Sequence, residues 1–438
     1  MTNERVTVVG AGLAGSEAAW QLLRRGIPVR LVEMRPERMT PAHVTGGFAE
    51  LVCSNSLKAE HLTNASGLLK AEMKLFDSLI LRAAEQARVP AGGALAVDRA
   101  AFSAAVTDAL ASHPLCEVAR GEAREIPDAP CVVATGPLTG EALAQAIGRL
   151  PGMRALHFFD AEAPIVTAES IDMTRAFRAS RYGRGEGDDY INCPMTEAEY
   201  NAFYDALISA ELAEVHEFEK KLVFEGCLAV EILAARGRMT LAFGPLKPVG
   251  LVDPRTGKHP FAVVQLRQDN AAGTLYNMVG FQTRLKWGEQ KRVFGLIPGL
   301  EHAEFARYGV MHRNTYLESP QVLGENFALR GNPLIRFAGQ MTGVEGYVES
   351  AASGLVAGVG LAMRLQGREE ILFSGRTVMG ALMRHTITPT ADFQPMNANF
   401  GLLDPLDARP RGGKKARCEQ LSERALRVMR EAIDTYDP

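Results

Sequence analysis

Three glycines and one glutamate near the N-terminus have the residue types and the spacing of a dinucleotide site. The β-branched run Arg5–Val9 leads directly into Gly10, Gly12 and Gly15. A helical pattern follows, and a second apolar strand then stops at Glu33. In such a turn the glycines allow the sharp bend, the approach of a pyrophosphate and close helix–strand packing, and the acid binds ribose hydroxyls. The predicted cofactor contacts are Gly10, Ala11, Gly12, Leu13, Ala14, Gly15 and Glu33.

A second glycine-rich segment, Phe337–Gly346, separates a predicted strand from a small-residue helix that runs from Tyr347 to about Met363. The start of such a helix can aim backbone N–H groups at a flavin pyrimidine ring or at a ribityl phosphate. Taken alone, the segment is equally compatible with a tightly packed Ala/Gly helix. Taken with the first turn, it favours FAD over NAD. The candidate contacts here are Gly339, Gln340, Gly343, Val344 and Gly346.

Two cysteines are candidates for covalent chemistry. Cys53 is followed by three residues that favour helix N-caps, so the sequence predicts a helix start there, with Lys58 nearby. The helix dipole and the lysine would both favour a thiolate. Cys227 follows a glycine and has carboxylates on both sides. A lone cysteine is more often a small buried hydrophobe, which is our interpretation of Cys116, Cys131, Cys193 and Cys418.

The elements that must position these residues form an α/β pattern. Cys131–Pro137 is predicted to be the strand that returns to a flavin-binding sheet. Apolar residues from Leu69 to Ala83 follow helical spacing, and Pro90 should end that single helix. We therefore expect a Rossmann-type, glutathione-reductase-like FAD domain that is discontinuous, with an inserted α/β domain. The predicted parts are 1–150 and 306–438 for the FAD domain and 151–305 for the insertion.

The insertion is expected from residue 151, where the pattern of predicted elements changes. Strand-like stretches there alternate with Gly/Asp-rich loops such as Tyr182–Asp189. The predicted strands are Ala163–Ala168, Phe261–Leu266 and Thr274–Phe281.

Composition limits the class of protein. The chain has 438 residues, 47% of them hydrophobic, and a formal net charge of −3, which suits two or three domains. No apolar run reaches the roughly 18 residues of a membrane span, and the first strand begins too early for a signal peptide. The six cysteines show no CxxC spacing, which argues against a zinc ribbon and a disulfide framework. We expect a cytoplasmic protein without a metal site.

Longer strings of residues make the chain resemble a known family, the folate- and FAD-dependent tRNA (uracil-5-)-methyltransferases called TrmFO, which are related to the larger MnmG/GidA flavoproteins. The resemblance runs nearly end to end and is far more specific than a glycine pattern. The strings are Val9–Gly15, Leu51–Lys58, Pro90–Arg99, Ala134–Pro137, Gly226–Cys227, Phe243–Leu251, Val264–Asn270, Trp287–Arg292, Tyr308–Thr315 and Phe393–Gly401.

The resemblance implies methylation of C5 of uridine 54 in the tRNA T-loop. The carbon would come from 5,10-methylenetetrahydrofolate and the electrons from FAD reduced by NAD(P)H. C5 of uracil becomes nucleophilic when a thiolate adds to C6, and a base must later remove the C5 proton. On this basis Cys227 is the expected nucleophile and Cys53 the second thiol, as proton acceptor or protecting cap, although the two roles can be exchanged. One departure from the family pattern is Ala229, where a proline is common.

Candidate RNA and folate contacts are less specific. Lys286, Lys291 and Arg292 flank Trp287, a basic–aromatic mixture that suits RNA phosphates and a stacked base. A basic run near the C-terminus is more often a solvated helix face than an RNA site; its residues are Arg409, Arg411, Lys414, Lys415 and Arg417. Other candidates, which lie in the family-like strings, are Arg267, Asn270, His312, Arg313 and Asn314.

Three alternatives remain open at this point. An MnmG-like enzyme would modify the tRNA wobble uridine, but the chain lacks the long helical C-terminal extension of that type. A flavin disulfide oxidoreductase would be expected to carry a close dithiol such as CxxC. A non-catalytic flavin-containing RNA-binding protein would tolerate replacement of Cys53 or Cys227 by alanine.

Overall fold

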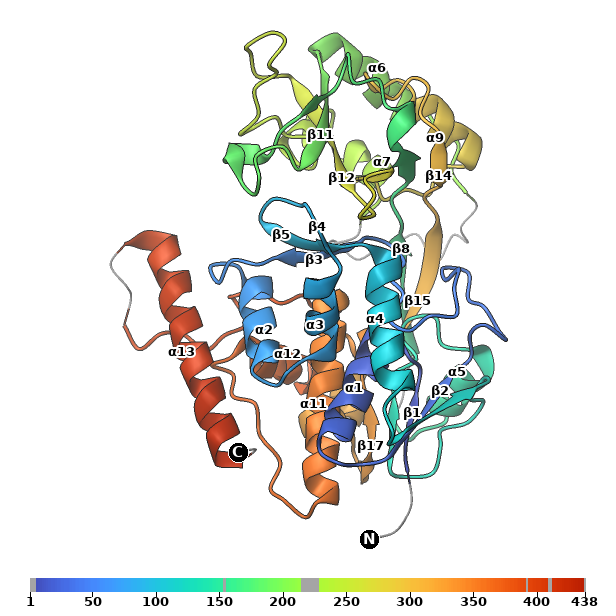
Figure 1. Cartoon of the computed structure of the whole chain (residues 1–438), viewed down its shortest axis with the longest axis vertical. Coiled ribbons are helices and arrows are strands. Elements are labelled where there is room, and N and C mark those ends of the chain that lie inside the picture. Colours follow the sequence, from blue (N-terminus) through green and yellow to red (C-terminus); the bar gives the residue numbers. More distant parts are fainter. Residues whose placement is uncertain (1–4, 153–154, 214–227, 391–392, 409–411, 437–438) are drawn as a thin grey trace.

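The computed structural model describes residues 5–152, 155–213, 228–390, 393–408 and 412–436. The chain forms two bodies stacked along its longest axis, each built on a six-stranded sheet (Figure 1). The parallel-sheet body contains both ends of the chain. The antiparallel-sheet body is formed by the described residues between 162 and 308, namely 162–213 and 228–308.

The parallel-sheet body has the strand order β16-β17-β7-β1-β2-β6, and β16 alone of these runs antiparallel to its neighbour. The strands are β1 (Val6–Val9), β2 (Val29–Glu33), β6 (Cys116–Arg120), β7 (Cys131–Val133), β16 (Ala328–Leu329) and β17 (Asn332–Phe337). Although β17 lies far from β7 in the sequence, Ile335 pairs with Cys131. The carboxyl ends of β1, β7 and β17 therefore meet at one edge, where open α/β sheets bind ligands. Both predicted glycine-rich segments begin at that edge.

Two helices, α1 (Leu13–Arg24) and α11 (Tyr347–Leu365), cross in direct backbone contact. A Cβ atom at Gly354 would lie 2.0 Å from the Ala14 carbonyl oxygen, and one at Gly358 would lie 2.7 Å from that of Ala18. The small residues of α11 are therefore required by packing. This helix is long and apolar enough to cross a membrane, but 83% of its most apolar stretch is buried, as expected for a core helix.

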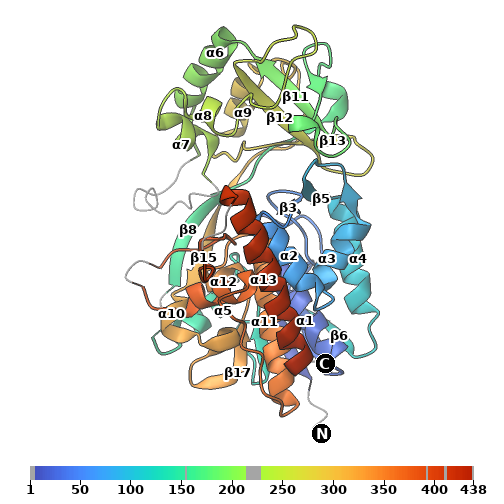
Figure 2. The same ribbon diagram turned by 90° about the vertical axis from the view of Figure 1, so that its left-hand side faces the viewer.

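Other helices cover the parallel-sheet body. The C-terminal helix α13 lies on its outside along α2 (Figure 2). The bounds are α2 (Ala65–Lys74), α3 (Leu79–Gln86), α4 (Arg99–Ala111), α5 (Glu141–Gly148), α10 (Ser319–Val322), α12 (Val378–Ile387) and α13 (Gly413–Tyr436). A small sheet faces the antiparallel-sheet body (Figure 1), and its strands are β3 (Ser56–Ala59), β5 (Ala94–Val97) and β4 (Arg88–Val89).

The antiparallel-sheet body has the strand order β10-β11-β12-β13-β9-β14. Its strands are β9 (Ile165–Thr167), β10 (Phe177–Arg178), β11 (Tyr190–Met195), β12 (Ala262–Gln268), β13 (Leu275–Met278) and β14 (Phe305–Arg307). The three strands predicted in this region are confirmed as β9, β12 and β13. The helices are α6 (Glu197–Ile208), α7 (Val230–Ala235), α8 (Thr240–Phe243) and α9 (Trp287–Phe294).

An antiparallel ribbon of two strands, β8 (Ala155–Ala161) and β15 (Met311–Leu317), joins the two bodies (Figure 1). Both chain crossings between the bodies thus run side by side. The domain boundaries at 150–151 and 305–306 remain a prediction from the sequence. We propose them as the limits of the inserted domain.

Two local predictions were wrong. The single helix expected from Leu69 to beyond Ala83 is two helices, because Asp77 has a positive φ of 50° and Ser78 caps the start of α3. The helix expected after Cys53 is a loop followed by β3, since Ser56 pairs with Ala96 of β5. Pairing with a distant strand overrode the local preference for a helix cap, so the helix start predicted beside Cys53 is absent from the described residues.

Candidate active site

A cleft opens at the carboxyl edge of the parallel sheet and contains about 1030 Å³ of empty space, part of it open to solvent. Open α/β sheets bind nucleotides and other small ligands in clefts at this edge. The predicted residues that line it are Gly10, Gly12, Leu13, Ala14, Glu33, Gly339 and Gln340. The predicted residues that do not line it are Ala11, Gly15, Gly343, Val344 and Gly346.

The first glycine turn fits a diphosphate for steric reasons. A Cβ atom at Gly15 would lie 1.7 Å from the Gly10 carbonyl oxygen, whereas one at Gly12 would meet no atom within 4 Å. Gly15 therefore serves packing, and Gly12 leaves open space at the start of α1. Gly12 is the N-cap of α1, and no side chain caps the helix there. The free N–H groups and the positive end of the helix dipole suit an anionic diphosphate.

Glu33 ends β2 and presents a buried carboxylate to the cleft. Its Oε2 accepts the Ala11 N–H at 2.8 Å, and its Oε1 accepts the backbone and Nε hydrogens of Arg35 at 3.0 Å. Burial favours the neutral acid, but the hydrogen bonds and charge of Arg35 outweigh it, and the pKa of Glu33 is lowered. Arg35 Nη2 also donates to Oε2, at the longer distance of 3.4 Å, and a ribose hydroxyl can take the place of this weak bond. Together with the first turn, these residues fit FAD.

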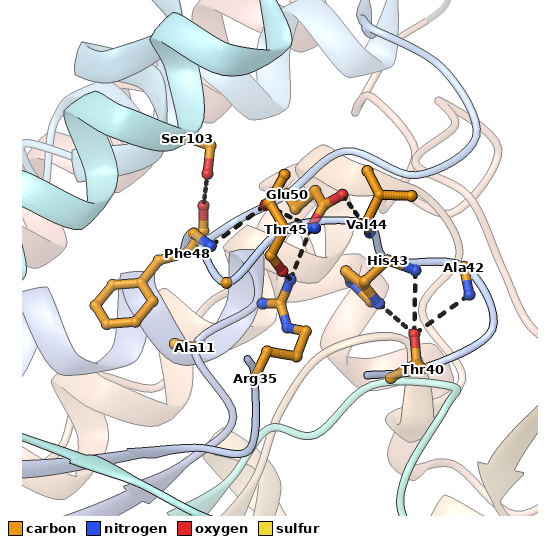
Figure 3. Close-up of polar contacts among 12 residues, drawn as sticks. Ala11, Arg35, Thr40, Ala42, His43, Val44, Thr45, Phe48, Glu50 and Ser103 are labelled. Atoms are coloured by element: carbon orange, nitrogen blue, oxygen red, sulfur yellow. Dashed lines mark hydrogen bonds and ion pairs between the residues drawn. The ribbon is translucent and has the colours of Figure 1, made fainter. Parts of the chain in front are cut away.

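Segment 40–50 lies beside Arg35 (Figure 3) and contributes Thr40, His43 and Glu50 to the wall of the cleft. Arg35 donates from Nη1 to Glu50 Oε2 at 2.9 Å. The Glu50 carboxylate also accepts the backbone N–H groups of Val44 at 2.9 Å and Thr45 at 3.1 Å. Because the arginine and the acid satisfy one another and the loop backbone, this wall is organised without a ligand.

The second glycine-rich segment makes room mainly for side chains. Gly343 has φ +88°, and a Cβ atom there would lie 2.4 Å from the ring of Phe393. Gly346 has φ +118°, and its Cβ would lie 2.3 Å from a carboxylate oxygen of Glu349. Their glycine requirement is therefore explained by packing and backbone conformation, and the cleft is reached only by the first two predicted residues of this segment.

Tyr347 links the cleft to Cys53. Its ring lines the cleft, and its Oη accepts the backbone N–H groups of Cys53 at 2.8 Å and Ser54 at 3.2 Å. Oη also lies 3.0 Å from Cys53 Sγ. Burial and the neighbouring Cys53 raise the pKa of Tyr347 well above its usual value. Since a phenol oxygen has two lone pairs, both used here, its hydrogen is left to donate to the sulfur. This donor suits an anionic sulfur.

Two arginines, one from each body, hold the Cys53 loop. Arg99 donates to the Leu51 carbonyl oxygen and forms an ion pair with Asp269 at 3.0 Å. Arg267, which is buried, donates from Nε to Asn55 Oδ1 at 2.9 Å and from Nη2 to the neighbouring Ser54 hydroxyl at 2.8 Å. Both guanidinium groups interact electrostatically with Cys53. The thiol therefore lies at the junction of the two bodies, among cations and hydrogen-bond donors.

Several predicted site residues cannot be placed. Cys227, Arg409 and Arg411 lie outside the described residues. The structure describes the backbone of β15 but not the side chains of His312, Arg313 and Asn314.

The predicted RNA contacts that are described lie on the surface. Trp287 is 62% exposed, and its ring stacks on Tyr308 with centroids 5.4 Å apart. Lys286 pairs with Glu211 at 2.8 Å, and Lys291 is exposed. Lys414, Lys415 and Arg417 are exposed on the first turns of α13. Of the remaining candidates, Asn270 hydrogen-bonds within its own turn, to Thr274.

Apart from Arg267, the residues that build the wall and those that hold the Cys53 loop were not predicted from the sequence. Arg35, His43, Glu50, Arg99 and Tyr347 were not among the candidates. Tyr347 followed a predicted cofactor segment, but no spacing links it to Cys53, from which it is separated by 294 positions. Arg35 and Glu50 follow the predicted ribose-binding acid in the sequence, and this position was the one signal that could have indicated them.

Comparison with known proteins agrees with this geometry. Residues 5–369 match the family described as glucose inhibited division protein A. The chain is 59% identical over 436 residues to the methylenetetrahydrofolate–tRNA-(uracil-5-)-methyltransferase TrmFO of Desulforamulus reducens, covering 99% of this chain and 98% of that protein. It is 63% identical over 406 residues to the TrmFO of Desulforudis audaxviator, covering 92% of each.

A solved structure of Aquifex aeolicus GidA superposes with a TM-score of 0.70 at 15% identity, over 98% of this chain and 73% of that one. At this identity the likeness concerns the fold, and it confirms the predicted Rossmann-type α/β class. The resemblance seen in the sequence is confirmed by the identity to the two curated relatives. The chain belongs to the TrmFO family, within the wider group of glucose inhibited division protein A.

Proposed function

We propose that this protein methylates C5 of uridine 54 in the tRNA T-loop. The net reaction replaces the C5 hydrogen by a methyl group, with the carbon from 5,10-methylenetetrahydrofolate and two electrons from reduced FAD, which NAD(P)H regenerates. The relatives that are 59–63% identical carry the name of this reaction. The enzyme would act in the cytoplasm, on tRNA and without a protein partner.

The residues of the chain would divide the work between binding and covalent chemistry. The start of α1, with Gly10 and Gly12, would hold the cofactor diphosphate, and Glu33 would bind a ribose. Cys227 would add to C6 of the uracil and make C5 nucleophilic. Cys53 would then accept the C5 proton, or protect the site between turnovers, so that the first thiolate can leave.

One observation supports a chemical role for Cys53 most strongly. Its sulfur lies 3.0 Å from Tyr347 Oη, and Tyr347 also lines the nucleotide cleft. A purely structural cysteine would be expected in apolar surroundings. The sulfur instead contacts the buried Tyr347 hydroxyl, and it interacts electrostatically with Arg99 and Arg267.

The reaction can be tested with purified protein, NADPH, ¹⁴C-methylenetetrahydrofolate and an unmodified tRNA transcript. We expect label in the transcript, no label when the T-loop uridine is changed to cytidine, and no label with Cys227→Ala or Cys53→Ala. Cys116→Ala is the matched control, because Cys116 lies on β6 at the far side of the sheet, and it should retain activity. FAD and tRNA binding without label transfer would contradict the proposal and favour wobble-uridine modification or a non-catalytic RNA-binding role.

A further inference from the structure

His43 lines the cleft, as Glu33 does, and it lies on the loop beside Arg35 (Figure 3). The reaction proposed above does not use it. It lies on the wall formed by segment 40–50. Its Nδ1 is 2.6 Å from Thr40 Oγ1, whereas the structure gives Nε2 no hydrogen bond with any described residue. Nε2 is therefore the ring nitrogen that remains for a molecule in the cleft.

The hydrogen bonds around Thr40 determine which nitrogen carries the proton. Thr40 Oγ1 accepts the backbone N–H groups of Ala42 at 3.3 Å and of His43 at 3.2 Å. A hydroxyl has two acceptor lone pairs and one hydrogen, so the hydrogen is left for His43 Nδ1. The reverse arrangement would give the oxygen three donors and leave its own hydrogen without an acceptor. This network assigns the neutral ring its hydrogen at Nε2.

The surroundings of His43 keep the ring neutral. Burial, and then the positive charge of Arg35, lower its pKa to about 4, although Glu50 and Glu33 act in the opposite direction. Arg307, which reaches over from β14 and donates to the Ala42 carbonyl oxygen, adds a second positive charge. At neutral pH the lining of the cleft therefore includes both an uncharged histidine and the anionic Glu33.

We propose that His43 is a cofactor-positioning residue that donates its Nε2 hydrogen to an oxygen of the diphosphate–ribose chain of FAD, with Thr40 fixing the required tautomer. A phosphate oxygen accepts hydrogen bonds only, and a ribose oxygen also accepts them, so both fit this donor. A neutral donor complements Glu33, which is already held in its anionic form and acts as an acceptor. The inference rests on the FAD site of the proposed function.

Affinity for FAD tests the proposal without any assay of methylation. FAD-free protein is titrated with FAD, and quenching of flavin fluorescence gives the dissociation constant. His43→Leu should bind FAD roughly 10- to 100-fold more weakly, as expected for one lost hydrogen bond to a polar or charged acceptor. His43→Gln, which keeps an N–H donor, should recover most of this loss. Thr40→Val should weaken binding, and the matched Thr40→Ser should not.

Two results of this titration would overturn the proposal. One is wild-type affinity in His43→Leu. The other is an equal loss in His43→Leu and His43→Gln, which would indicate loop packing without a donated hydrogen. Parallel titration with ADP distinguishes the acceptors: a loss shared by ADP places the oxygen in the adenosine diphosphate half, and a loss confined to FAD places it on the ribityl side.

The tautomer can be measured directly by ¹⁵N NMR of protein labelled on histidine, with the His43 signals assigned by their loss in His43→Gln. We expect a protonated Nε2 and an unprotonated Nδ1 at pH 7 in the FAD-free protein. A protonated Nδ1 would overturn the assignment. If wild-type protein fails to bind FAD, the proposed function fails; if wild type binds and His43→Leu binds equally, only the present inference fails.

Discussion

The two ends of the cleft are built in different ways. The dinucleotide end uses the Gly10–Gly15 turn, Glu33 and the wall at 40–50, all within the first 50 residues, and its polar groups satisfy one another. The thiol end brings Cys53 to Tyr347, 294 positions away, and to Arg267 of the antiparallel-sheet body. The first end is organised mainly by local contacts, with one hydrogen bond from Arg307 of the antiparallel-sheet body to Ala42, whereas the second depends on the junction of the two bodies.

This difference predicts how each end responds to change. Substitutions at the dinucleotide end should alter cofactor affinity, because the surrounding hydrogen bonds hold the rest of that end in place. Substitutions at the thiol end should alter the reactivity of the sulfur and the docking of the two bodies while the cofactor still binds.

The largest effect is expected from Gly15→Ala. Its Cβ would lie 1.7 Å from the Gly10 carbonyl oxygen, so the turn must shift, and stability should fall by about 1–3 kcal/mol or more. FAD binding should be lost, as measured by flavin fluorescence. Gly12→Ala is the matched variant: its Cβ meets nothing within 4 Å, so the FAD-free protein should keep its Tm while FAD affinity falls. Equal Tm values for the two variants would contradict the division between packing and ligand approach.

Gly343→Ala should be destabilising with little effect on the cofactor. Its φ of +88° costs a non-glycine residue about 1–2 kcal/mol, and the Phe393 ring must also move. Thermal unfolding of the FAD-free protein measures the loss. Addition of Phe393→Leu to Gly343→Ala should restore part of the stability. A large fall in FAD affinity in Gly343→Ala would show that this glycine belongs to the cofactor site.

Tyr347→Phe tests the thiol end. Removal of the hydroxyl leaves the Cys53 and Ser54 N–H groups without their acceptor and removes the donor to the sulfur, at a cost of about 1–2 kcal/mol. The pH profile for alkylation of Cys53 by iodoacetamide, followed by mass spectrometry, should move to higher pH. Tyr308→Phe, in the surface stack with Trp287, is the control. An unchanged profile in Tyr347→Phe would remove the tyrosine from the chemistry of the thiol.

The smallest effect is a pH dependence at the dinucleotide end. The folded-state pKa of His43 is about 4, below its ordinary 6.5, so the unfolded chain binds more protons between these values. Stability attributable to His43 is therefore fully present above pH 6.5 and is lost as the pH falls toward 4, by at most about 1.4 kcal/mol per pH unit. Urea unfolding at pH 7 and pH 5 should show a smaller difference for His43→Gln than for wild type. Identical differences would contradict a buried neutral ring.

The same contrast explains what the sequence could predict. The Gly10–Gly15 turn and Glu33 were found because strand, turn, helix and acid follow one another within one βαβ unit, where spacing carries the information. The β17 return was also predicted, since its strand and helix are contiguous. Five predicted cofactor contacts do not line the cleft. Three of them are glycines, and a glycine needed for packing has the same sequence signature as a glycine needed for ligand approach.

The thiol end was predicted only in outline. The residues after Cys53 favour a helix cap, yet the backbone forms β3, because pairing with β5 is a non-local interaction. The break at Asp77 was missed for a related reason: the apolar spacing continues through a turn that only its positive φ reveals. Neither Tyr347 nor Arg99 shares a motif with Cys53. Their roles follow from the contact between segments that no spacing rule connects.

The most direct test of the account uses a tRNA transcript with 5-fluorouridine at the T-loop uridine. Fluorine at C5 cannot leave as a proton, so the thiol that has added to C6 stays attached once the carbon has been transferred. With methylenetetrahydrofolate and NADPH, the account predicts a denaturation-resistant protein–tRNA complex whose modified peptide contains Cys227, absent in Cys227→Ala and present in Cys53→Ala. Attachment at Cys53 would exchange the two roles. No attachment at either cysteine, with FAD and tRNA bound, would contradict the account.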